Sequence, residues 1–306
     1  MDITIVIVNW NTKDLLRDCL ESVYKTVKDV TFEVIVVDNA SQDGSVAMVR
    51  EAFPCVDIIE NSENRGFSAA NNQALRAMKG RYALLLNTDA ILTEGAVHEL
   101  FAFMEDHDGA AMAGGQLLNE DGSRQNSIAN FPTLFSLLMN LPLLEALFPG
   151  RYPSKRYEHR EPLAVESVIG ACVLVRRRAV DEVGMLDEGY FFFFEETDWA
   201  FRMQSAGYKV YHVPSARIYH LQGRSIGRDV RSRIAFYRSR YRFFGKWKGC
   251  VYNRAIRSVV FVRLIANWLL TSVGTALTAG VSRELRDKWV IYSRLILWHL
   301  RGCPPA

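Results

Sequence analysis

The first 90 residues alternate between short apolar runs and segments with helical spacing, and this alternation restricts the fold more than any other feature. Four runs rich in aliphatic residues cover residues 3–8, 32–38, 56–60 and 81–87. The first two are too short for helices and too continuously apolar for strands with one face in water. The segments between the runs have the three- or four-residue spacing of amphipathic helices. The alternation therefore predicts an α/β fold with an open, mostly parallel sheet flanked by helices.

Carboxylates follow two of these runs. Asp38 closes the second run, and Asp89 follows the fourth within an Asn-Thr-Asp segment. Open parallel sheets bind ligands beyond the carboxyl ends of their strands. Asp38 could accept hydrogen bonds from a base imide or a sugar hydroxyl, or it could cap a turn. Asp89 could coordinate a divalent cation that bridges a diphosphate, or it could cap a helix.

An acidic cluster lies between the aromatic run 190–194 and a predicted helix. It contains Glu195, Glu196 and Asp198. A carboxyl group beside phenylalanine side chains can have a raised pKa and act as a base. Acidic residues also favour the first turn of a helix because of the helix dipole, and the two interpretations are compatible. His220 ends a later predicted strand, where it could be a structural residue or a functional one.

The motifs of several other classes of protein are missing from the sequence. No G-x-G-x-x-G follows the first predicted strand, and the G-x-x-x-x-G-K-[ST] and G-x-S-x-G motifs do not occur. The five cysteines are widely spaced without a C-x-x-C pair, which disfavours a disulfide framework or zinc site and favours a reducing compartment. Because the chain begins directly with a strand-like run, we expect no secretory signal.

The middle of the chain has a weaker pattern. Residues 116–130 resemble a hairpin or loop with Asp121-Gly122 at its turn, and residues 131–163 contain five prolines, which favours a mobile loop region. Strand character returns at three segments, which are residues 167–175, 209–214 and 216–220.

Charge is divided unequally along the chain, although its net charge is only +3. Residues 1–150 carry 10 basic and 21 acidic residues, whereas residues 151–306 carry 27 basic and 13 acidic residues. From Trp199 onward there are 20 basic and 3 acidic residues. Such a split predicts that one end of the protein faces an anionic partner. The 49% hydrophobic and 23% charged content excludes a disordered chain and a multi-span membrane protein.

Seven motifs follow one another in a characteristic order over residues 2–225. They are VNWN at 8–11, VIVVDNASQDGS at 34–45, NRGFSAANN at 64–72, LLLNTDA at 84–90, GACVLVRR at 170–177, FFFFEETDW at 191–199 and YHVPSARIYH at 211–220. This ordered set resembles the family-2 glycosyltransferases of the GT-A fold, which is Rossmann-like. It is most similar to the bacterial rhamnosyltransferase-like branch, which builds cell-wall and surface polysaccharides.

The resemblance implies a site for a nucleotide-sugar donor. In this family, positions matching the VNWN segment line the nucleotide pocket, the position of Asp38 reads the pyrimidine base, and the NRG segment lies beside the donor. Gly170 could let the backbone approach a ligand, or it could serve strand packing. The implied donor-binding residues are Val8, Asn9, Asn11, Asp38, Asn64, Arg65, Gly66, Asn87, Thr88, Asp89 and Gly170.

The resemblance also implies a cation, Mg²⁺ or Mn²⁺. Asn87, Thr88 and Asp89 occupy the metal-binding acidic motif of the family, and Asp89 aligns with its last carboxylate. His220 matches a position that can complete the coordination. Asn87 and Thr88 depart from the fully acidic version of the motif, so fewer charges would hold the ion.

A general base is implied at Glu196, where the family often has Asp. Glu195 is the competing candidate for this base, and Asp198 could orient the site. Such a base takes the proton of an acceptor hydroxyl as its oxygen attacks the anomeric carbon. Because the attack comes from the side opposite the leaving diphosphate, the reaction inverts the anomeric configuration.

Residues 226–306 form a basic, aromatic extension with helical patterns. Residues 228–247 interleave basic and aromatic residues, residues 264–281 are 18 consecutive uncharged residues, and residues 284–301 are amphipathic. We expect this extension to associate with an anionic membrane surface, in plane or re-entrant. Packed soluble helices and a true membrane span are the alternatives. Binding of nucleic acid is disfavoured because no nucleic-acid motif occurs.

The sequence therefore predicts a glycosyltransferase domain at residues 1–225 and a helical, membrane-associating extension at residues 226–306. The function implied is that of an inverting, metal-dependent glycosyltransferase, peripheral on the inner face of the cytoplasmic membrane. dTDP-rhamnose or another dTDP- or UDP-sugar is the expected donor, and a lipid-linked saccharide or polysaccharide is the expected acceptor. The departures at Asn87, Thr88 and Glu196 keep open a non-catalytic sugar-nucleotide-binding or membrane scaffold protein of the same fold.

Overall fold

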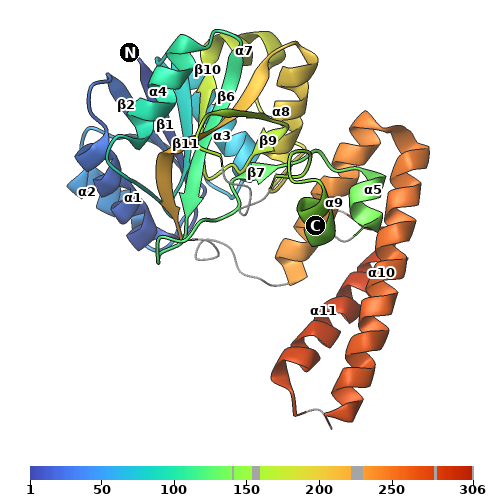
Figure 1. Ribbon diagram of the computed structural model, residues 1–306. Helices are drawn as coiled ribbons and strands as arrows, with labels where there is room; N and C mark the ends of the chain where they lie inside the picture. Colours follow the sequence, from blue (N-terminus) through green and yellow to red (C-terminus); the bar gives the residue numbers. More distant parts are fainter. Residues whose placement is uncertain (140, 154–158, 222–229, 279–280, 305–306) are drawn as a thin grey trace. The chain divides into compact units, whose positions relative to one another are not determined.

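The chain forms two compact units. The first comprises Met1–Phe131 and Glu145–Ser225, and the second comprises Pro132–Leu144 and Ile226–Ala306 (Figure 1). The computed structural model describes residues 1–139, 141–153, 159–221, 230–278 and 281–304.

Among the described residues, a nine-stranded sheet forms the centre of the first unit. Its strands are β1 (Ile3–Asn9), β2 (Phe32–Asp38), β3 (Asp57–Glu60), β4 (Tyr82–Asn87), β5 (Ala90–Leu92), β6 (Ala110–Leu118), β8 (Leu163–Val165), β10 (Cys172–Arg176) and β11 (Lys209–His220). Their order is β3-β2-β1-β4-β10-β6-β11-β5, with β8 beside β11.

The predicted α/β fold is confirmed, and the direction of the strands changes across the sheet. The four strands from β3 to β4 are parallel, as expected from the alternating pattern. Beyond them the sheet is mixed, because β10 runs antiparallel to both β4 and β6, and β11 runs antiparallel to β5 and β8. β6 and β11 are parallel to each other.

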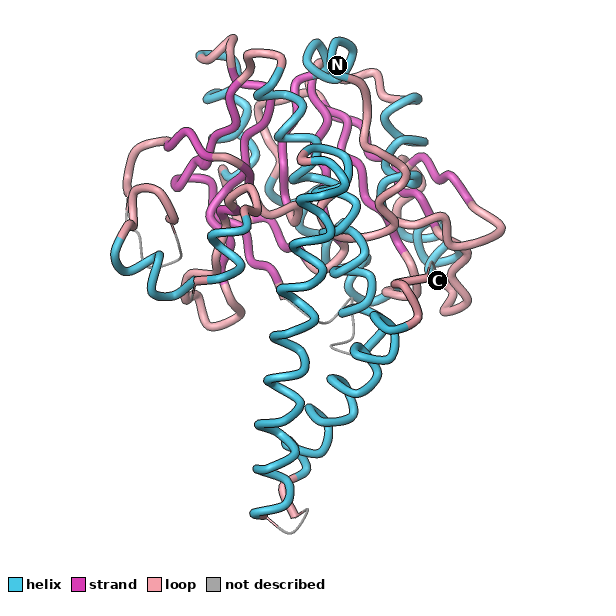
Figure 2. The backbone as a smooth tube through the Cα atoms, turned by 90° about the vertical axis from the view of Figure 1, so that its right-hand side faces the viewer, coloured by secondary structure: helices cyan, strands magenta, loops and turns pink. Residues whose placement is uncertain are grey.

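Helices cover both faces of this sheet, which gives three layers (Figure 2). α1 (Lys13–Thr26), α2 (Ser45–Ala52) and α4 (Ala96–Asp106) pack on one face, where they meet Ile5 and Ile7 of β1. α3 (Phe67–Ala77), α7 (Arg177–Val183) and α8 (Glu195–Ser205) pack on the other face, where they meet Val6. Successive side chains of β1 thus point to opposite faces, and both faces are buried, which explains its continuously apolar sequence.

Three predicted segments differ from the structure. The expected strand at 167–175 is broken at Gly170, and its first part, β9 (Ser167–Val168), pairs with β7 (Ile128–Ala129) in a separate sheet. The two strands expected at 209–220 are one strand, with a register shift where Pro214 lacks a backbone N–H. Two short helices, α5 (Leu134–Leu138) and α6 (Leu141–Leu147), lie within the expected loop 131–163.

The predicted turn at Asp121-Gly122 is present. Gly122 has a φ of 79°, and Leu118 and Arg124 form a bridge across the turn. The central strand β6 had no sequence signal because alanine and glycine fill most of it. A Cβ atom at Gly115 would lie 2.4 Å from the backbone oxygen of Ala216, so the close approach of β6 and β11 requires this glycine.

The second unit is helical. It contains α9 (Val230–Trp247), α10 (Gly249–Leu277) and α11 (Arg283–Leu300), which confirms the helical patterns of the extension. Its core includes Tyr241 and Phe244 of α9, Ile256 and Leu264 of α10, and Trp298 of α11. Among the described residues, α10 is the one helix that is long and apolar enough to cross a membrane, by length and composition alone.

Trp199 of α8 is expected to be a principal support of the first unit. Its side chain is fully buried, and its indole N–H donates a hydrogen bond of 2.8 Å to the backbone oxygen of Gly184. Trp199→Ala should lower the free energy of unfolding by about 3–5 kcal/mol, because it opens a cavity and removes this donor. Urea unfolding measures the loss. The exposed Phe148→Ala serves as the control, and an equal effect of the two substitutions would contradict the packing described.

Candidate active site

Three parallel strands end together at one edge of the sheet. In the register of β1 and β2, Asn9 lies opposite Asp38, and in the register of β1 and β4, Val8 lies opposite Asn87. The structure therefore brings together predicted residues that are far apart in the sequence. This edge is where open α/β sheets bind their ligands.

Hydrogen bonds hold Asp38 in place at this edge. Asn9 is buried, and its amide donates to Asp38 Oδ1 at 2.8 Å and to Ser41 Oγ at 3.0 Å. The backbone N–H of Ser41 donates to Asp38 Oδ2 at 2.8 Å. Thr12 Oγ1 lies 2.7 Å from Asn9 Oδ1 and 3.0 Å from Thr88 Oγ1, which links this network to the segment after β4.

Asn11 joins two loops of the site. It has a φ of 52°, a left-handed conformation that asparagine tolerates better than most residues. Its backbone N–H donates to Ser41 Oγ at 2.9 Å, and its side-chain oxygen accepts from the backbone N–H of Gln42 at 2.7 Å. Asn11 thus fixes the loop after β1 against the loop after β2.

The loop of Asn64, Arg65 and Gly66 packs against the aromatic run before α8. Asn64 Oδ1 accepts from the backbone N–H of Gly66 at 2.9 Å. Gly66 has a φ of 82°, and a Cβ atom there would lie 2.7 Å from Phe191 Cδ2. The backbone N–H of Phe67 donates to the oxygen of Phe191 at 2.8 Å, and Arg65 is exposed. The predicted donor loop is therefore joined to the segment that leads to Glu195.

Asp89 and His220 face each other across β5 and β11. Asp89 Oδ1 lies 3.4 Å from His220 Nε2, and both side chains are buried. Gln125 contacts the histidine at two points. Its amide nitrogen donates to the His220 backbone oxygen at 2.5 Å, and its Oε1 lies 3.0 Å from His220 Nδ1. Since Oε1 can only accept, Nδ1 carries the proton in this contact, and Nε2 is the ring nitrogen that faces Asp89.

This donor set fits a divalent cation shared with a diphosphate. An oxygen of Asp89 and a ring nitrogen of His220 face each other, and both are atom types that can coordinate a cation. Within the described ranges, no group of three His, Cys, Asp or Glu side chains forms a complete metal cage. Ions such as Mg²⁺ commonly take one or two protein ligands and complete their coordination with substrate phosphates and water.

Glu196 lies beside the break between β9 and β10. A Cβ atom at Gly170 would lie 3.6 Å from Glu196 Cγ, so the side chain packs directly on this glycine. The next residue, Ala171, accepts a hydrogen bond of 2.9 Å from the backbone N–H of Asn87. Asn87 Oδ1 is buried with no hydrogen-bond partner in the described part of the chain. The break thus connects the candidate base with the predicted metal-binding segment.

The backbone before α8 is strained. Phe193 and Phe194 both have positive φ values, 70° and 68°, which are uncommon for bulky residues. Such strain is maintained by surrounding structure and clusters at functional sites. Here it accompanies the entry of Glu195 and Glu196 into the first turn of α8.

Burial changes the acidity of both glutamates. It raises the pKa of Glu196 to about 7. It raises the pKa of Glu195 well above its ordinary value, and the neighbouring charge of Glu196 adds to this shift. Glu195 Oε2 is buried without a hydrogen-bond partner among the described residues. Burial without a partner favours the neutral form of Glu195, whereas Glu196 is partly exposed, which suits a group that exchanges a proton with a ligand.

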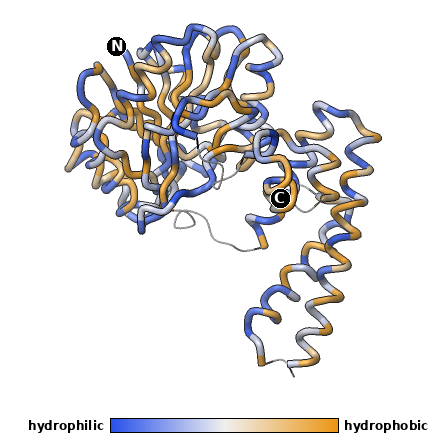
Figure 3. The backbone as a smooth tube through the Cα atoms, in the orientation of Figure 1, coloured by the Kyte–Doolittle hydropathy of each residue, from blue (hydrophilic) through white to orange (hydrophobic). Residues whose placement is uncertain are grey.

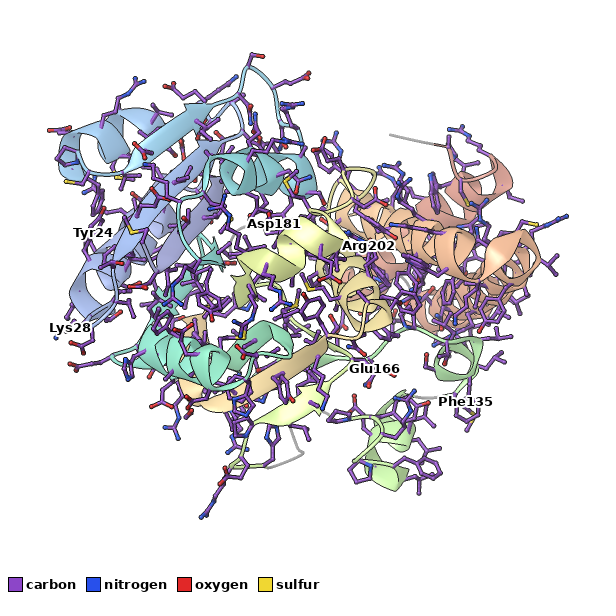
Figure 4. All side chains as sticks on the ribbon, turned by 90° about the horizontal axis from the view of Figure 1, so that it is seen from above. Tyr24, Lys28, Phe135, Glu166, Asp181 and Arg202 are labelled. Carbon is purple, nitrogen blue, oxygen red and sulfur yellow. The ribbon has the colours of Figure 1, made fainter. Side chains whose placement is uncertain are left out.

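Asp198 has the contacts of a residue that holds α8 in place. It is fully buried, and its Oδ2 lies 3.0 Å from Nε of Arg202, which Figure 4 labels on α8. Arg202 also donates to the backbone oxygens of Val183 and Met185 at 3.0 and 2.7 Å. The pair ties α8 to the loop after α7. Any effect of Asp198 on the site would therefore act through the position of the helix.

Sequence reasoning missed the residues that position the predicted ones. Gln125 lies in the segment expected to be a hairpin or loop, and no local pattern marks it as a partner of His220. Thr12 directly follows the VNWN segment, and Ser41 lies in the VIVVDNASQDGS segment, so their places in recognised motifs could have indicated them. Phe191 belongs to the aromatic run, but its fit against Gly66 depends on tertiary structure.

The fold is that of a GT-A glycosyltransferase. The family model for glycosyl transferase family 2 matches residues 4–184, and the chain belongs to this family. The predicted family and its rhamnosyltransferase-like character are confirmed. The chain is 30% identical over 258 residues to N-acetylglucosaminyl-diphospho-decaprenol L-rhamnosyltransferase of Mycobacterium tuberculosis, which covers 75% of this chain and 83% of that relative.

Further relatives support the same fold. The low-salt glycan biosynthesis hexosyltransferase of Haloferax volcanii is 24% identical over 280 residues, with 88% of this chain and 83% of the relative covered. The solved mannosyltransferase of Pyrobaculum calidifontis, in complex with GDP-Man and Mn²⁺, has a TM-score of 0.57 at 16% identity and covers 97% of this chain and 87% of its own. GalNAc-T7, solved with UDP, GalNAc and Mn²⁺, has a TM-score of 0.56 at 17% identity. The match covers 72% of this chain and 44% of GalNAc-T7.

The raised pKa values of the two glutamates predict that stability falls as pH rises. Between about pH 4.5 and 7 the folded protein keeps protons that the unfolded chain releases, so the stability present below about pH 4.5 is lost through this range. Glu195→Gln removes one of the groups whose pKa is raised in the folded protein. In the absence of divalent cations, it should therefore raise the urea midpoint at pH 8 and reduce the decline between pH 5 and 8.

Glu188→Gln is a control for which the opposite change in stability at pH 8 is expected. Hydrogen bonds from Asn72 and Arg76 lower the pKa of Glu188, so this substitution should reduce stability at pH 8. An unchanged pH dependence in Glu195→Gln would contradict the proposed burial of a protonated carboxyl group.

Proposed function

We propose that the protein is an inverting glycosyltransferase that moves a sugar from a nucleotide-diphosphate donor to a hydroxyl of a lipid-linked acceptor in cell-envelope glycan synthesis. The observation that carries this proposal is the position of Glu196. Its carboxyl group, with a pKa of about 7, packs on Gly170 beside the segment from Asn87 to Asp89. A base near neutrality thus lies next to the residues expected to hold the donor diphosphate.

The donor end of the site is proposed to recognise a pyrimidine nucleotide. An ionised carboxylate has about four lone-pair positions, and two hydrogen bonds to Asp38 come from Asn9 and Ser41. The remaining lone pairs can accept from a base imide. dTDP-rhamnose is the first donor to test, because of the similarity to an L-rhamnosyltransferase, and other dTDP- and UDP-sugars follow.

In the proposed reaction, deprotonated Glu196 takes the proton from the acceptor hydroxyl. The acceptor oxygen forms a bond to the anomeric carbon while the bond between that carbon and the diphosphate oxygen breaks. Because the incoming and leaving groups lie on opposite sides of the sugar, the configuration inverts.

Asp89 and His220 are proposed to hold a divalent cation, Mg²⁺ or Mn²⁺. Such an ion supplies positive charge against the charge that develops on the leaving diphosphate. Asp89 provides the carboxylate oxygen and His220 the Nε2 lone pair, while Gln125 keeps the imidazole in the required tautomer. Mn²⁺ accompanied the ligands of both solved neighbours, which supports this proposal.

We place the enzyme on the inner face of the cytoplasmic membrane as a peripheral protein. The relative in Mycobacterium tuberculosis is named for a decaprenol-linked substrate, which supports a lipid-linked acceptor. Residues 226–306 contain 16 basic and 3 acidic residues, which favours contact with anionic lipid.

Glu196→Gln is the direct test of the base. It should lower the rate of transfer from dTDP-rhamnose to an N-acetylglucosaminyl-diphospho-lipid by about 10²–10⁴-fold, because the amide cannot take the proton. In the wild type, kcat/KM should rise with pH and level off above about pH 7. Product formation is measured by chromatography of the labelled lipid.

Two comparisons make this test specific. Glu195→Gln should retain transfer, since that residue is assigned the neutral form. Full activity in Glu196→Gln would refute the base assignment. Donor binding by thermal stabilisation without turnover of any nucleotide sugar would instead support the non-catalytic sugar-nucleotide-binding protein.

Removal of divalent cations should abolish transfer, and added Mn²⁺ or Mg²⁺ should restore it. Gln125→Leu should raise the Mn²⁺ concentration for half-maximal activity by about 10–100-fold, because the histidine loses the partner that sets its tautomer. His220→Ala should raise it further. Titration of Mn²⁺ into chelator-treated enzyme measures these effects, with the exposed His98→Ala as control. If EDTA leaves turnover unchanged, the metal role of Asp89 and His220 is wrong.

A further inference from the structure

One face of α10 is an exposed stripe of uncharged, mainly apolar side chains. Its large members are 52–83% exposed and recur at helical spacing along the whole helix. Ala255, Ser258 and Ala266 are also exposed and fill the intermediate positions. At about 100° per residue, these positions fall within an arc of about 120°. We call this surface the α10 stripe, and its large members are Val251, Val262, Leu269, Leu270, Val273 and Leu277.

Cationic residues border the α10 stripe on both sides. On the same helical projection, Arg254 precedes the arc and Arg263 follows it, and both are exposed. Arg263 also donates from Nη1 to the backbone oxygen of Leu137 at 2.5 Å, so its other guanidinium nitrogens are the ones that can face a ligand. Long arginine side chains can keep their stems on an apolar surface while their charged ends reach a polar layer. Figure 3 shows the hydrophobic colour along α10. An apolar stripe between cationic borders is typical of a helix that lies in a membrane interface.

The charge of this unit favours an anionic partner. Its described acidic side chains, Glu284 and Asp287 on α11, each lie near a cation one helical turn away, namely Lys288 at 2.5 Å and Arg283 at 4.0 Å. The arginines beside the stripe thus meet no described carboxylate in an ion pair. A second copy of the chain docked on the same stripe would bring like charges together, which opposes a symmetric dimer.

The pairing of α10 with α11 opposes a membrane span. The indole N–H of Trp268 donates to Ser293 Oγ at 2.9 Å, and that of Trp289 donates to Ser272 Oγ at 3.0 Å. The start of α11, with Arg283, Arg286 and Lys288, therefore lies near the end of α10. A span of α10 would carry these cations to the far side of the membrane, against the preference for positive charge on the cytoplasmic side.

We propose that the α10 stripe is the surface by which the second unit binds an anionic lipid bilayer, with the helix lying in the plane of the interface. Its apolar side chains enter the boundary between headgroups and acyl chains, and Arg254 and Arg263 reach lipid phosphates. This inference rests on the proposed function, because an enzyme with a lipid-linked acceptor must work at a bilayer.

Point substitutions test this surface better than truncation. A deletion after residue 250 would remove Ile256, Leu264 and Trp298 from the core around Tyr241 and would unfold the unit. The exposed positions of the stripe can be changed without this loss. Leu270→Gln, Val273→Gln and Leu277→Gln are therefore combined in one triple variant. The matched control combines Leu147→Gln and Phe148→Gln, which replace two exposed apolar side chains of the first unit.

The experiment measures flotation of the full chain with vesicles of phosphatidylglycerol and phosphatidylcholine, without donor or acceptor. The triple variant should partition at least about 10-fold more weakly than the wild type, since three apolar side chains lose their burial in lipid. Arg254→Gln should weaken binding to the anionic vesicles and reduce its dependence on salt. The control variant should bind as the wild type does.

Other outcomes would overturn the proposal. Unchanged flotation of the triple variant would exclude the stripe as the lipid surface. Loss of self-association in sedimentation, with lipid binding unchanged, would assign the stripe to a second copy of the chain. Resistance of the wild type to alkaline extraction from membranes would indicate a span.

Vesicle binding and sugar transfer are measured independently, so failure of one proposal can be distinguished from failure of the other. Flotation needs no catalysis, so vesicle binding by a chain that transfers no sugar would refute the proposed function and leave the surface standing. Conversely, the triple variant should keep its transfer rate on a short, water-soluble acceptor analogue while losing activity on vesicle-bound acceptor.

Discussion

The parallel register of β1, β2 and β4 is the constraint on which the rest of the first unit depends. It places Asn9 opposite Asp38 and Val8 opposite Asn87, so that three strand ends share one edge. Both faces of these strands are covered by helices, so ligands can approach only at the ends. The site is therefore a consequence of how the sheet is buried, and the loops that complete it extend from a rigid edge.

The three carboxyl groups in the first turn of α8 have different surroundings. Asp198 is buried with the guanidinium of Arg202 at 3.0 Å and has a structural partner for its charge. Glu195 is buried without such a partner, and its pKa is raised. Glu196 lies between these extremes, partly exposed on Gly170, and its pKa of about 7 suits proton transfer. The first turn of α8 thus contains one carboxylate with a guanidinium partner and two carboxyl groups with raised pKa values.

The second unit differs in composition from the first. Its interior is an aromatic and aliphatic core around Tyr241 and Phe244, and its outer face on α10 is apolar without charge. Nearly all of the excess positive charge of the protein lies in this part of the sequence. A surface that combines uncharged apolar residues with arginine borders differs in kind from the polar edge that would hold a nucleotide.

The sequence by itself determined the α/β class, the strands with aliphatic runs, the family motifs and most candidate residues, because these leave local patterns. It did not reveal β6, whose alanines and glycines give no strand signal, nor the break at Gly170. Only the tertiary structure decided that Glu196 packs on this glycine and that Gln125 orients His220. These relations join segments distant in the chain. They follow from close packing and buried hydrogen bonding, which no local spacing of residues encodes.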